Sequence, residues 1–153
     1  MMTQFQSRGF TLFEMLATVG IISILATSAV PSFSHMMKRD RLVADINRLH
    51  SVFKFARSEA VKRDTEISLV ATNSSKWKVI QNAGTDERTV LLQFIPSDSS
   101  VQISGLADLI ISSSGSTSAL DIQLSDDDQT TDDYRLCIFL SGQSIITTAA
   151  QCP

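Results

Sequence analysis

The sequence has few of the residues from which catalytic and metal-binding sites are built. It contains two cysteines and two histidines among 153 residues. His35 and His50 are 15 residues apart on a predicted helix, so they cannot form an adjacent pair of metal ligands. Neither cysteine has a zinc-site spacing, and there is no glycine-rich phosphate loop or serine-elbow motif. We therefore predict that the protein is not an enzyme and binds no cofactor or metal ion.

The spacing of the cysteines and the length of the chain limit the possible disulfides and the number of domains. Cys137 and Cys152 are too far apart for a redox CxxC motif, so the chain allows one intrachain disulfide. In an oxidising compartment such a bridge contributes about 3 kcal/mol of stability, by a mechanism that depends on the model used. We predict this disulfide; the alternative is a pair of buried thiols. The length allows a long helix and one modest globular domain.

An apolar run near the start of the chain contains a single carboxylate. From Phe10 to Val30 there are 21 residues, and Glu14 is the only ionisable side chain among them. A helix of about 20 apolar residues crosses the hydrocarbon core of a bilayer. A secretory signal differs, because its apolar core has about 7 to 15 residues and ends at a small-residue cleavage site. We therefore expect this segment to remain in the working protein as a membrane-spanning helix.

The residues around this run resemble the N-terminus of type IV prepilins. A short polar leader, residues 1–9, ends in Gly9 and is followed by Phe10, Glu14 and the apolar helix. The resemblance implies that a prepilin peptidase cuts between Gly9 and Phe10 and methylates the new N-terminus on Phe10. Glu14 then becomes the fifth residue of the mature chain. Pro31 lies where members of this family often carry a proline that kinks the helix.

Glu14 also calls for a physical explanation. A charge at mid-bilayer costs about 2.5 to 3.5 kcal/mol on insertion scales, and it persists where a partner or a function compensates. Cleavage supplies a partner, because the new ammonium group on Phe10 lies one helical turn away and can face the carboxylate of a neighbouring subunit. Such pairing sets the axial register of assembly. The alternative is a glutamate close enough to the helix end to reach the lipid headgroups.

Periodic apolar residues predict that the helix continues beyond the membrane segment. The stripe recurs at spacings of three and four residues: Leu42, Ile46, Leu49, Phe53, Ala56 and Ala60. Pro31 should bend this helix rather than end it, because proline lacks the backbone N–H and crowds the preceding turn. Two i,i+4 ion pairs are expected on an exposed face: Arg41 with Asp45, and Glu59 with Arg63.

From Asp64 onward the pattern changes to short β-strands separated by turns. Strands are predicted at residues 67–71, 77–80, 90–94, 101–103, 119–124, 134–140 and 144–148. The expected fold is α+β, the type IV pilin fold, in which a long N-terminal helix packs against a C-terminal antiparallel β-sheet head. The expected segments are a prepilin leader (1–9), a transmembrane and assembly helix (10–30), its amphipathic continuation (31–63) and a periplasmic β-rich head (64–153).

Several local patterns resemble one branch of this family. They are the helix end at residues 55–63, the strand that begins Tyr134-Arg135-Leu136-Cys137, the Ser141-Gly142 turn and the final Cys152. They resemble the GspH/FimT branch, which covers H-type pseudopilins of type II secretion and minor pilins of type IV pili. These patterns and the N-terminal motif cover well under half of the chain.

Charge is divided unevenly along the chain. Residues 31–63 carry eight basic and three acidic side chains, a net charge of +5, whereas residues 64–153 carry four basic and twelve acidic ones, a net charge of −8. A positive stalk and a negative head could steer one subunit toward another. A solvated helix face explains the same distribution equally well.

Two charged segments are candidates for ligand binding. The acidic cluster at residues 126–133 offers carboxylates to calcium, but it lacks the glycine and glutamate of an EF-hand, which favours a solvated loop. Some FimT-like proteins bind DNA through a Gly-Arg-x-Arg pattern, and this chain has Gly142-Gln143-Ser144-Ile145 at that place. The missing arginines and the acidic head argue against DNA binding. The remaining basic patch at the helix end consists of Lys54, Arg57, Lys62 and Arg63.

The positive-inside rule does not decide the orientation of this chain. Arg8 is the only basic residue before the span, whereas Lys38, Arg39 and Arg41 follow it, which by that rule favours a cytoplasmic head. We set the rule aside because this basic group begins eight residues beyond Val30 and leads into a long domain. The resemblance and the cysteines both favour the periplasm.

The resemblance implies a structural function at the cell envelope. We expect a minor pilin of a type IV pilus, in a minor-pilin complex that primes assembly and lies near the filament tip. The alternatives are an H-type minor pseudopilin of a type II secretion system and a FimT-like pilin for DNA uptake. Expected partners are other minor pilins, the major pilin, the prepilin peptidase, the inner-membrane assembly platform and membrane lipid. The expected location is the bacterial inner membrane, crossed once with the C-terminal domain in the periplasm, and then the pilus at the cell surface.

Overall fold

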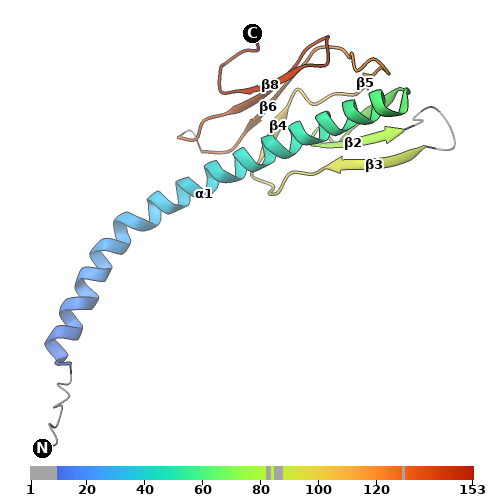
Figure 1. Cartoon of the computed structure of the whole chain (residues 1–153). Helices are drawn as coiled ribbons and strands as arrows, with labels where there is room; N and C mark the ends of the chain where they lie inside the picture. Colours follow the sequence, from blue (N-terminus) through green and yellow to red (C-terminus); the bar gives the residue numbers. More distant parts are fainter. Residues whose placement is uncertain (1–9, 82–83, 85–87, 129) are drawn as a thin grey trace, which may run out of the picture. The chain divides into compact units, whose positions relative to one another are not determined.

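The computed structural model describes residues 10–81, 84, 88–128 and 130–153, which contain one helix and eight strands. The helix, α1, spans Leu12–Arg63 without a break and so continues through position 31. The chain forms two compact units, Met1–Met36 and Met37–Pro153. The second unit contains the latter part of α1 together with every described strand (Figure 1).

A threonine caps the start of α1. Thr11 Oγ1 accepts a hydrogen bond from the backbone N–H of Glu14 at 3.2 Å, and the Thr11 carbonyl accepts one from the N–H of Met15. Thr11 is therefore the N-cap, and Glu14 occupies the third helical position, where a carboxylate also interacts favourably with the helix dipole. This places Glu14 in the Ser/Thr-x-x-Glu spacing of a capping box, a local role for the residue in addition to any role in assembly.

The end of α1 confirms the predicted boundary. Asp64 adopts a left-handed conformation with φ of 49°, and the N–H of Thr65 bonds to the carbonyl of Ala60 at 3.2 Å. This is the Schellman arrangement, which satisfies a carbonyl that the helix itself leaves unpaired. The helix therefore ends at Arg63 and the chain turns directly into the first strand.

The apolar stripe on the latter part of α1 forms one side of a single core. All its predicted members are buried: Leu42, Ile46, Leu49, Phe53, Ala56 and Ala60. The strands supply the other side, with the following among the largest buried side chains: Trp77, Phe94, Leu69, Ile111, Ile122 and Leu136. Burying such a side chain contributes about 1.5 to 3 kcal/mol, so this packing accounts for most of the helix stability in the second unit.

The strands form two four-stranded antiparallel sheets. The order of the first sheet is β3-β2-β1-β5, with β1 at Ile67–Thr72, β2 at Lys76–Gln81, β3 at Thr89–Phe94 and β5 at Leu109–Ile111. The order of the second is β4-β6-β7-β8, with β4 at Gln102–Ser104, β6 at Leu120–Ser125, β7 at Tyr134–Ile138 and β8 at Ser144–Thr147. Figure 1 shows strands of both sheets beside the latter part of α1.

The predicted antiparallel β head on a helical stripe is confirmed, with three differences. The strand β5 was not expected from the sequence, and the head has two sheets rather than one. The predicted strand at 134–140 also ends earlier, at Ile138, because Phe139 begins the turn into β8: its N–H bonds to the Gln143 carbonyl at 2.9 Å.

Asp45 does not belong to the exposed ion pair expected from the sequence. Its side chain is fully buried, and Arg41 instead pairs with Asp98 at 3.2 Å. One Asp45 oxygen accepts hydrogen bonds from the backbone N–H of Ser97 at 2.9 Å and from its hydroxyl at 2.8 Å, and the other lies 3.3 Å from Arg48. A buried carboxylate with these partners fixes the loop after β3 to the helix. The expected pair of Glu59 with Arg63 is present, although Glu59 is buried rather than exposed.

A disulfide joins Cys137 in β7 to Cys152 near the end of the chain, with Cα atoms 5.7 Å apart. It closes a segment in which β8 is the only strand, so it holds β8 and the following tail to the second sheet. Because Cys137 is fully buried, the bridge also continues the core to the C-terminal tail.

Removing this disulfide should lower the free energy of unfolding by about 3 kcal/mol, as for loops of this size. The measurement is urea unfolding of the full chain in detergent, followed by the fluorescence of Trp77, the only tryptophan and a fully buried one. The variant is Cys152→Ser, which leaves the buried Cys137 in place, and reduced wild-type protein is the matched control. Equal unfolding midpoints for oxidised and reduced protein would contradict this expectation.

Candidate functional site

The described part of the first unit consists of the two residues before α1 and of α1 up to Met36, and its large apolar side chains are exposed. Leu12 and Phe13 are 81% and 80% exposed, and the other members of this surface are Phe10, Met15, Leu16, Val19, Ile21, Ile22, Ile24, Leu25, Val30, Phe33 and Met36. By length and composition this part of α1 can cross a membrane. A continuous apolar surface of this size needs lipid or other helices around it. We call it the apolar helix surface.

The residues expected to guide assembly lie at the start of this helix. Phe10 precedes the capping residue and is 73% exposed, and Glu14 lies in the first turn. Gly9, the other side of the expected cleavage point, lies outside the described residues. Position 31 lies within α1. Glu14 therefore lies in the first turn of α1, whereas Phe10 lies before the cap and outside the helix, so the helical turn expected between them is not formed within this chain.

Hydroxyl side chains in the same segment bond to the helix itself. Thr18 Oγ1 donates to the carbonyl of Met15 at 2.9 Å, and Ser23 Oγ to that of Val19 at 2.8 Å. Thr27 Oγ1 donates to the carbonyl of Ile24 at 2.7 Å. These bonds satisfy the hydroxyls of Thr18, Ser23 and Thr27, which makes the three side chains compatible with an apolar surrounding.

Basic residues where the second unit begins pair with acidic loops of that unit. Lys38 Nζ lies 2.9 Å from Asp128, and Arg41 pairs with Asp98. Chiefly through its hydrogen bond to Asp128, the pKa of Lys38 is raised. These two cations therefore pair with acidic loops of their own chain. Part of the opposite charge of helix and head is thus neutralised within one subunit rather than between subunits.

The Lys38 pair should make stability depend on pH in the acidic range. Hydrogen bonds from Lys38 and Thr130 hold the pKa of Asp128 well below its ordinary value of 3.8. A carboxylate with a depressed pKa stabilises the fold above its unfolded pKa, and this contribution is lost as pH falls below it. We expect the Lys38→Met variant to lose less stability than wild type between pH of about 4 and about 2, measured by Trp77 fluorescence in urea. Lys76→Met is the control, and equal pH dependence in wild type and Lys38→Met would refute the pairing.

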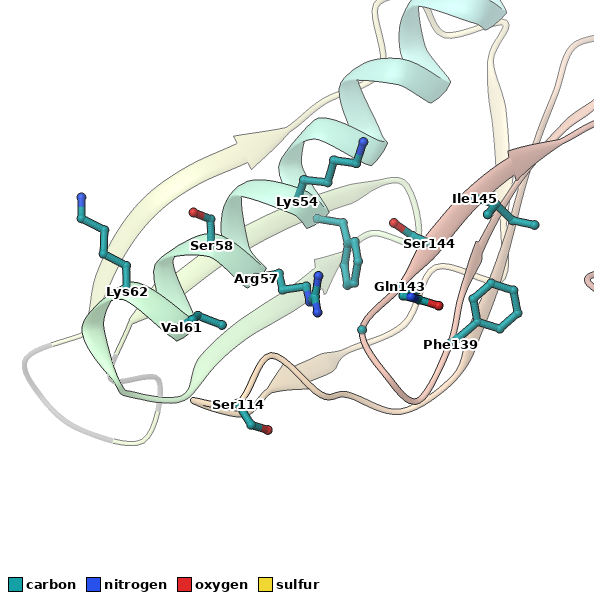
Figure 2. A pocket seen from close by; sticks show the side chains of 12 residues that line it. Lys54, Arg57, Ser58, Val61, Lys62, Ser114, Phe139, Gln143, Ser144 and Ile145 are labelled. Carbon is teal, nitrogen blue, oxygen red and sulfur yellow. The ribbon is translucent and has the colours of Figure 1, made fainter.

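A groove of about 960 Å³ lies between the end of α1 and the β7–β8 hairpin (Figure 2). One helix face supplies one wall, with residues Phe53, Lys54, Arg57, Ser58, Val61 and Lys62. The opposite side is formed by Ser114 and by hairpin residues Phe139, Gly142, Gln143, Ser144 and Ile145. We call this the basic groove. It unites the two features that the sequence left apart, the basic patch at the helix end and the Gly142–Ile145 segment.

Arg57 and two glycines join the walls of the basic groove. Arg57 Nε donates to the Gly115 carbonyl at 3.0 Å, and an Nη donates to the Ser141 carbonyl at 3.4 Å. Gly142 has a φ of 73°, and a Cβ built there would lie 1.9 Å from the Gly115 carbonyl oxygen. Only glycine fits at this position, because both the backbone conformation and the space exclude a side chain. Arg57 is therefore partly used in holding the fold, whereas Lys54 and Lys62 are exposed.

His50 lies beside the same groove. His50 Nε2 and Ser144 Oγ are 2.9 Å apart, which connects α1 to β8. Burial, followed by the charge of Lys54, lowers the pKa of His50. The imidazole is therefore neutral at neutral pH and serves as a hydrogen-bonding residue between helix and sheet.

The other candidate ligand residues do not assemble into a metal site in the described residues. Asp126 accepts hydrogen bonds from the Asp128 N–H and the Thr131 hydroxyl, so its carboxylate organises its own loop. Asp121 lies near the sulfurs of Cys137 and Cys152, but these sulfurs form the disulfide and offer no thiolate.

A long helix with an exposed apolar first half, and a latter half packed on antiparallel sheets, defines a type IV pilin-like protein. The family model described as type II transport protein GspH matches residues 45–143, and that of the prokaryotic N-terminal methylation motif matches residues 5–30. Because the first match covers more than half of the chain, this protein belongs to the GspH family, whose members are structural pilins and pseudopilins.

Solved structures show the same fold. The type IV minor pilin FimU of Pseudomonas aeruginosa aligns with a TM-score of 0.63 at 16% identity, over 77% of this chain and 96% of that one. The minor pseudopilin EpsH from the type II secretion system of Vibrio cholerae aligns with a TM-score of 0.60 at 9% identity, over 75% of this chain and 99% of that one. No curated protein matches the sequence. By family the chain is thus a pilin or pseudopilin, and it carries the N-terminal methylation motif and an apolar helix long enough to cross a membrane.

Proposed function

We propose that this protein is a minor pilin of a type IV pilus, similar to FimU, that joins other minor pilins in a complex priming assembly and lying near the filament tip. The observation that carries the proposal is the apolar helix surface. Its side chains remain exposed in the folded chain, so they need lipid before assembly and neighbouring helices after it. The similar fold of a structure described as a type IV minor pilin supports the choice of a pilus.

In this proposal the first step is processing at the inner membrane. The prepilin peptidase cuts between Gly9 and Phe10 and the new amine on Phe10 is methylated. The chain crosses the inner membrane once, with residues 64–153 in the periplasm. The methylation motif at residues 5–30 supports this order of events.

The second step is docking of the processed helix into a growing filament. Glu14 of one subunit and the amine of Phe10 on a neighbour form an ion pair that fixes the axial register. Breaking a buried ion pair leaves an uncompensated charge at a cost of about 3 to 5 kcal/mol, which is enough to reject a misplaced subunit. Pro31 bends the helix so that apolar surfaces of neighbours stay in contact.

The function is structural, without a catalytic step. The second unit presents surfaces to other minor pilins and to the major pilin, while the first unit contacts lipid and then the helices of neighbours. The inner-membrane assembly platform moves the subunit from one surrounding to the other. None of these assembly steps requires a bound cofactor.

An H-type minor pseudopilin of a type II secretion system is the second candidate. The description of the matching family model favours it, and the fold also resembles that of EpsH. Helix docking relies on the same interactions in a type IV pilus and in a type II secretion system. The two candidate functions therefore differ in which other pilins or pseudopilins the chain assembles with.

Gene deletion in the source bacterium separates the two candidates. For a minor pilin we expect loss of surface pili by electron microscopy and loss of twitching, with normal secretion of exoproteins, and restoration by the wild-type chain. Loss of secretion with normal piliation would assign the protein to the type II secretion system instead of the pilus. Normal piliation and normal secretion would refute both. A pull-down of tagged protein from membranes then identifies the accompanying pilins.

A further inference from the structure

The basic groove differs in charge from the β-rich part of the chain. Residues 64–153 carry a net charge of −8, yet no aspartate or glutamate is among the residues that line the groove, and its cations come from α1. Lys54, Arg57 and Lys62 line it instead. In the described part of the chain, no carboxylate forms an ion pair with Lys54 or Lys62, in contrast to Lys38 and Arg41. Two exposed cations therefore remain available to a ligand.

The groove also has an apolar component. Val61 is 52% exposed on the helix wall and Ile145 is 40% exposed on the hairpin wall, with Phe139 beside it. Figure 2 shows Lys54 and Lys62 projecting from α1, with the Lys62 side chain directed away from the hairpin, and Ile145 and Phe139 on the hairpin. A ligand that fits both walls must carry negative charge and apolar surface together.

The hairpin wall of the groove includes two residues of an edge strand, Ser144 and Ile145 of β8. Among the described strands β8 pairs only with β7, so one side of its backbone has no strand partner. Edge strands offer hydrogen-bonding groups to an extended segment of another chain. An extended polypeptide can therefore use the backbone of β8 as well as the side chains of the groove.

We propose that the basic groove binds an extended, acidic segment of a neighbouring pilin subunit, an assignment that rests on the proposed function. Lys54 and Lys62 are separated by eight residues, or about 12 Å along the helix. An extended strand advances about 3.3 Å per residue, so carboxylates about four residues apart match the two lysines. An apolar side chain between them packs against Val61 and Ile145.

A polypeptide fits this surface better than a nucleic acid does. Affinity for nucleic acid comes mainly from many phosphate contacts, whereas the groove has only two exposed lysines, and Arg57 is bonded to backbone carbonyls. A longer polyanion would leave the groove and meet the acidic remainder of the unit. Two lysines and an apolar wall suit a short segment in which charged and apolar residues alternate.

Site-specific photocross-linking in cells tests the proposal on the full chain. A photoreactive phenylalanine derivative replaces Ser58, an exposed groove residue, or Ser99, an exposed residue outside the groove, as the control. The cross-linked peptide is identified by mass spectrometry. We expect the Ser58 cross-link to fall on another pilin, in a segment with carboxylates three to five residues apart, and the Ser99 cross-link to be absent from that segment.

Charge reversal supplies the second measurement. The Lys54→Glu/Lys62→Glu variant should lower the yield of the Ser58 cross-link about tenfold. The control is Lys76→Glu/Lys78→Glu, which changes the same number of charges outside the groove and should leave the yield unchanged. Replacing the two carboxylate residues of the partner segment with lysine should restore the Ser58 cross-link in the Lys54→Glu/Lys62→Glu variant.

The outcomes separate this assignment from the proposed function. Incorporation of the chain into sheared filaments or pilin complexes is scored independently by immunoblot. If the chain assembles but Ser58 cross-links to DNA, to lipid, to a segment without carboxylates or to nothing, the groove assignment is overturned and the proposed function stands. A chain that neither assembles nor cross-links to a pilin overturns both.

Discussion

Replacing Glu14 with glutamine is expected to leave membrane insertion intact and to reduce incorporation of the chain into filaments by about a hundredfold or more. Glutamine keeps the size of the side chain and can occupy the same position of a capping box. It removes only the charge that we propose to pair with the amine of Phe10 on a neighbouring subunit. Loss of a buried ion pair costs about 3 to 5 kcal/mol, and each 1.4 kcal/mol is a factor of ten in an equilibrium. Membrane fractionation measures insertion, and immunoblots of sheared filaments measure incorporation.

Thr11→Ala is the matched control for this experiment. It removes the hydroxyl that accepts the Glu14 N–H and so weakens the helix start by about 1 kcal/mol, but it retains the carboxylate. If the charge of Glu14 sets the register, Thr11→Ala should assemble much better than Glu14→Gln. If Glu14 acts only as a capping residue, Glu14→Gln should assemble normally, and the ion-pair mechanism would be wrong.

The second large effect is expected at Gly142. Gly142→Ala places a Cβ 1.9 Å from the Gly115 carbonyl oxygen and 2.7 Å from Arg57 Nε, at a φ of 73°. The left-handed conformation alone costs about 1 to 2 kcal/mol for an alanine, and the clash with a backbone oxygen adds to it. We expect a loss of about 3 kcal/mol in the free energy of unfolding, measured by Trp77 fluorescence in urea.

Gly84→Ala is the control for this substitution. A Cβ built at Gly84 has no atom within 4 Å, so this variant should unfold within about 0.5 kcal/mol of wild type. Because Gly142 packs closely against Gly115 and Arg57, Gly142→Ala should also widen the basic groove and lower the yield of the Ser58 cross-link. A Gly142→Ala protein as stable as Gly84→Ala would show that the contact with Gly115 does not constrain the hairpin.

The helix was predictable from sequence because its signals are local. Apolar spacings of three and four residues defined the stripe that includes Leu42 and Phe53, and both side chains are buried. The end at Arg63 coincided with the change to a β pattern. Most strands were found for the same reason, since alternation and turn residues act over a few positions.

Features that depend on distant residues were not predictable in this way. The strand β5 has three residues, too few for a periodic pattern, and it forms by pairing with β1, about forty residues earlier. Asp45 is buried because Ser97, 52 residues later, bonds to it. Local spacing assigned Asp45 to an exposed helix pair with Arg41, and nothing in the sequence signalled Ser97 as its partner.

The basic groove was only half visible in the sequence. The basic residues and the Ser141-Gly142 turn could each be recognised, but their meeting depends on Gly115, which lies in a serine-rich loop with no distinctive pattern. The one local signal was the glycine of the Ser141-Gly142 turn. Glycine is common where the backbone adopts a positive φ or approaches another segment closely, and Gly142 has a φ of 73°.

We propose that the chain works as a processed pilin, with an amine on Phe10 that pairs with Glu14 of a neighbouring subunit. The decisive experiment is mass spectrometry of the N-terminal peptide of native protein, purified from membranes and sheared filaments. We expect a peptide that begins at residue 10 with N-methylated phenylalanine. A peptide that retains the Gly9–Phe10 bond, or that begins at any other residue, would contradict it.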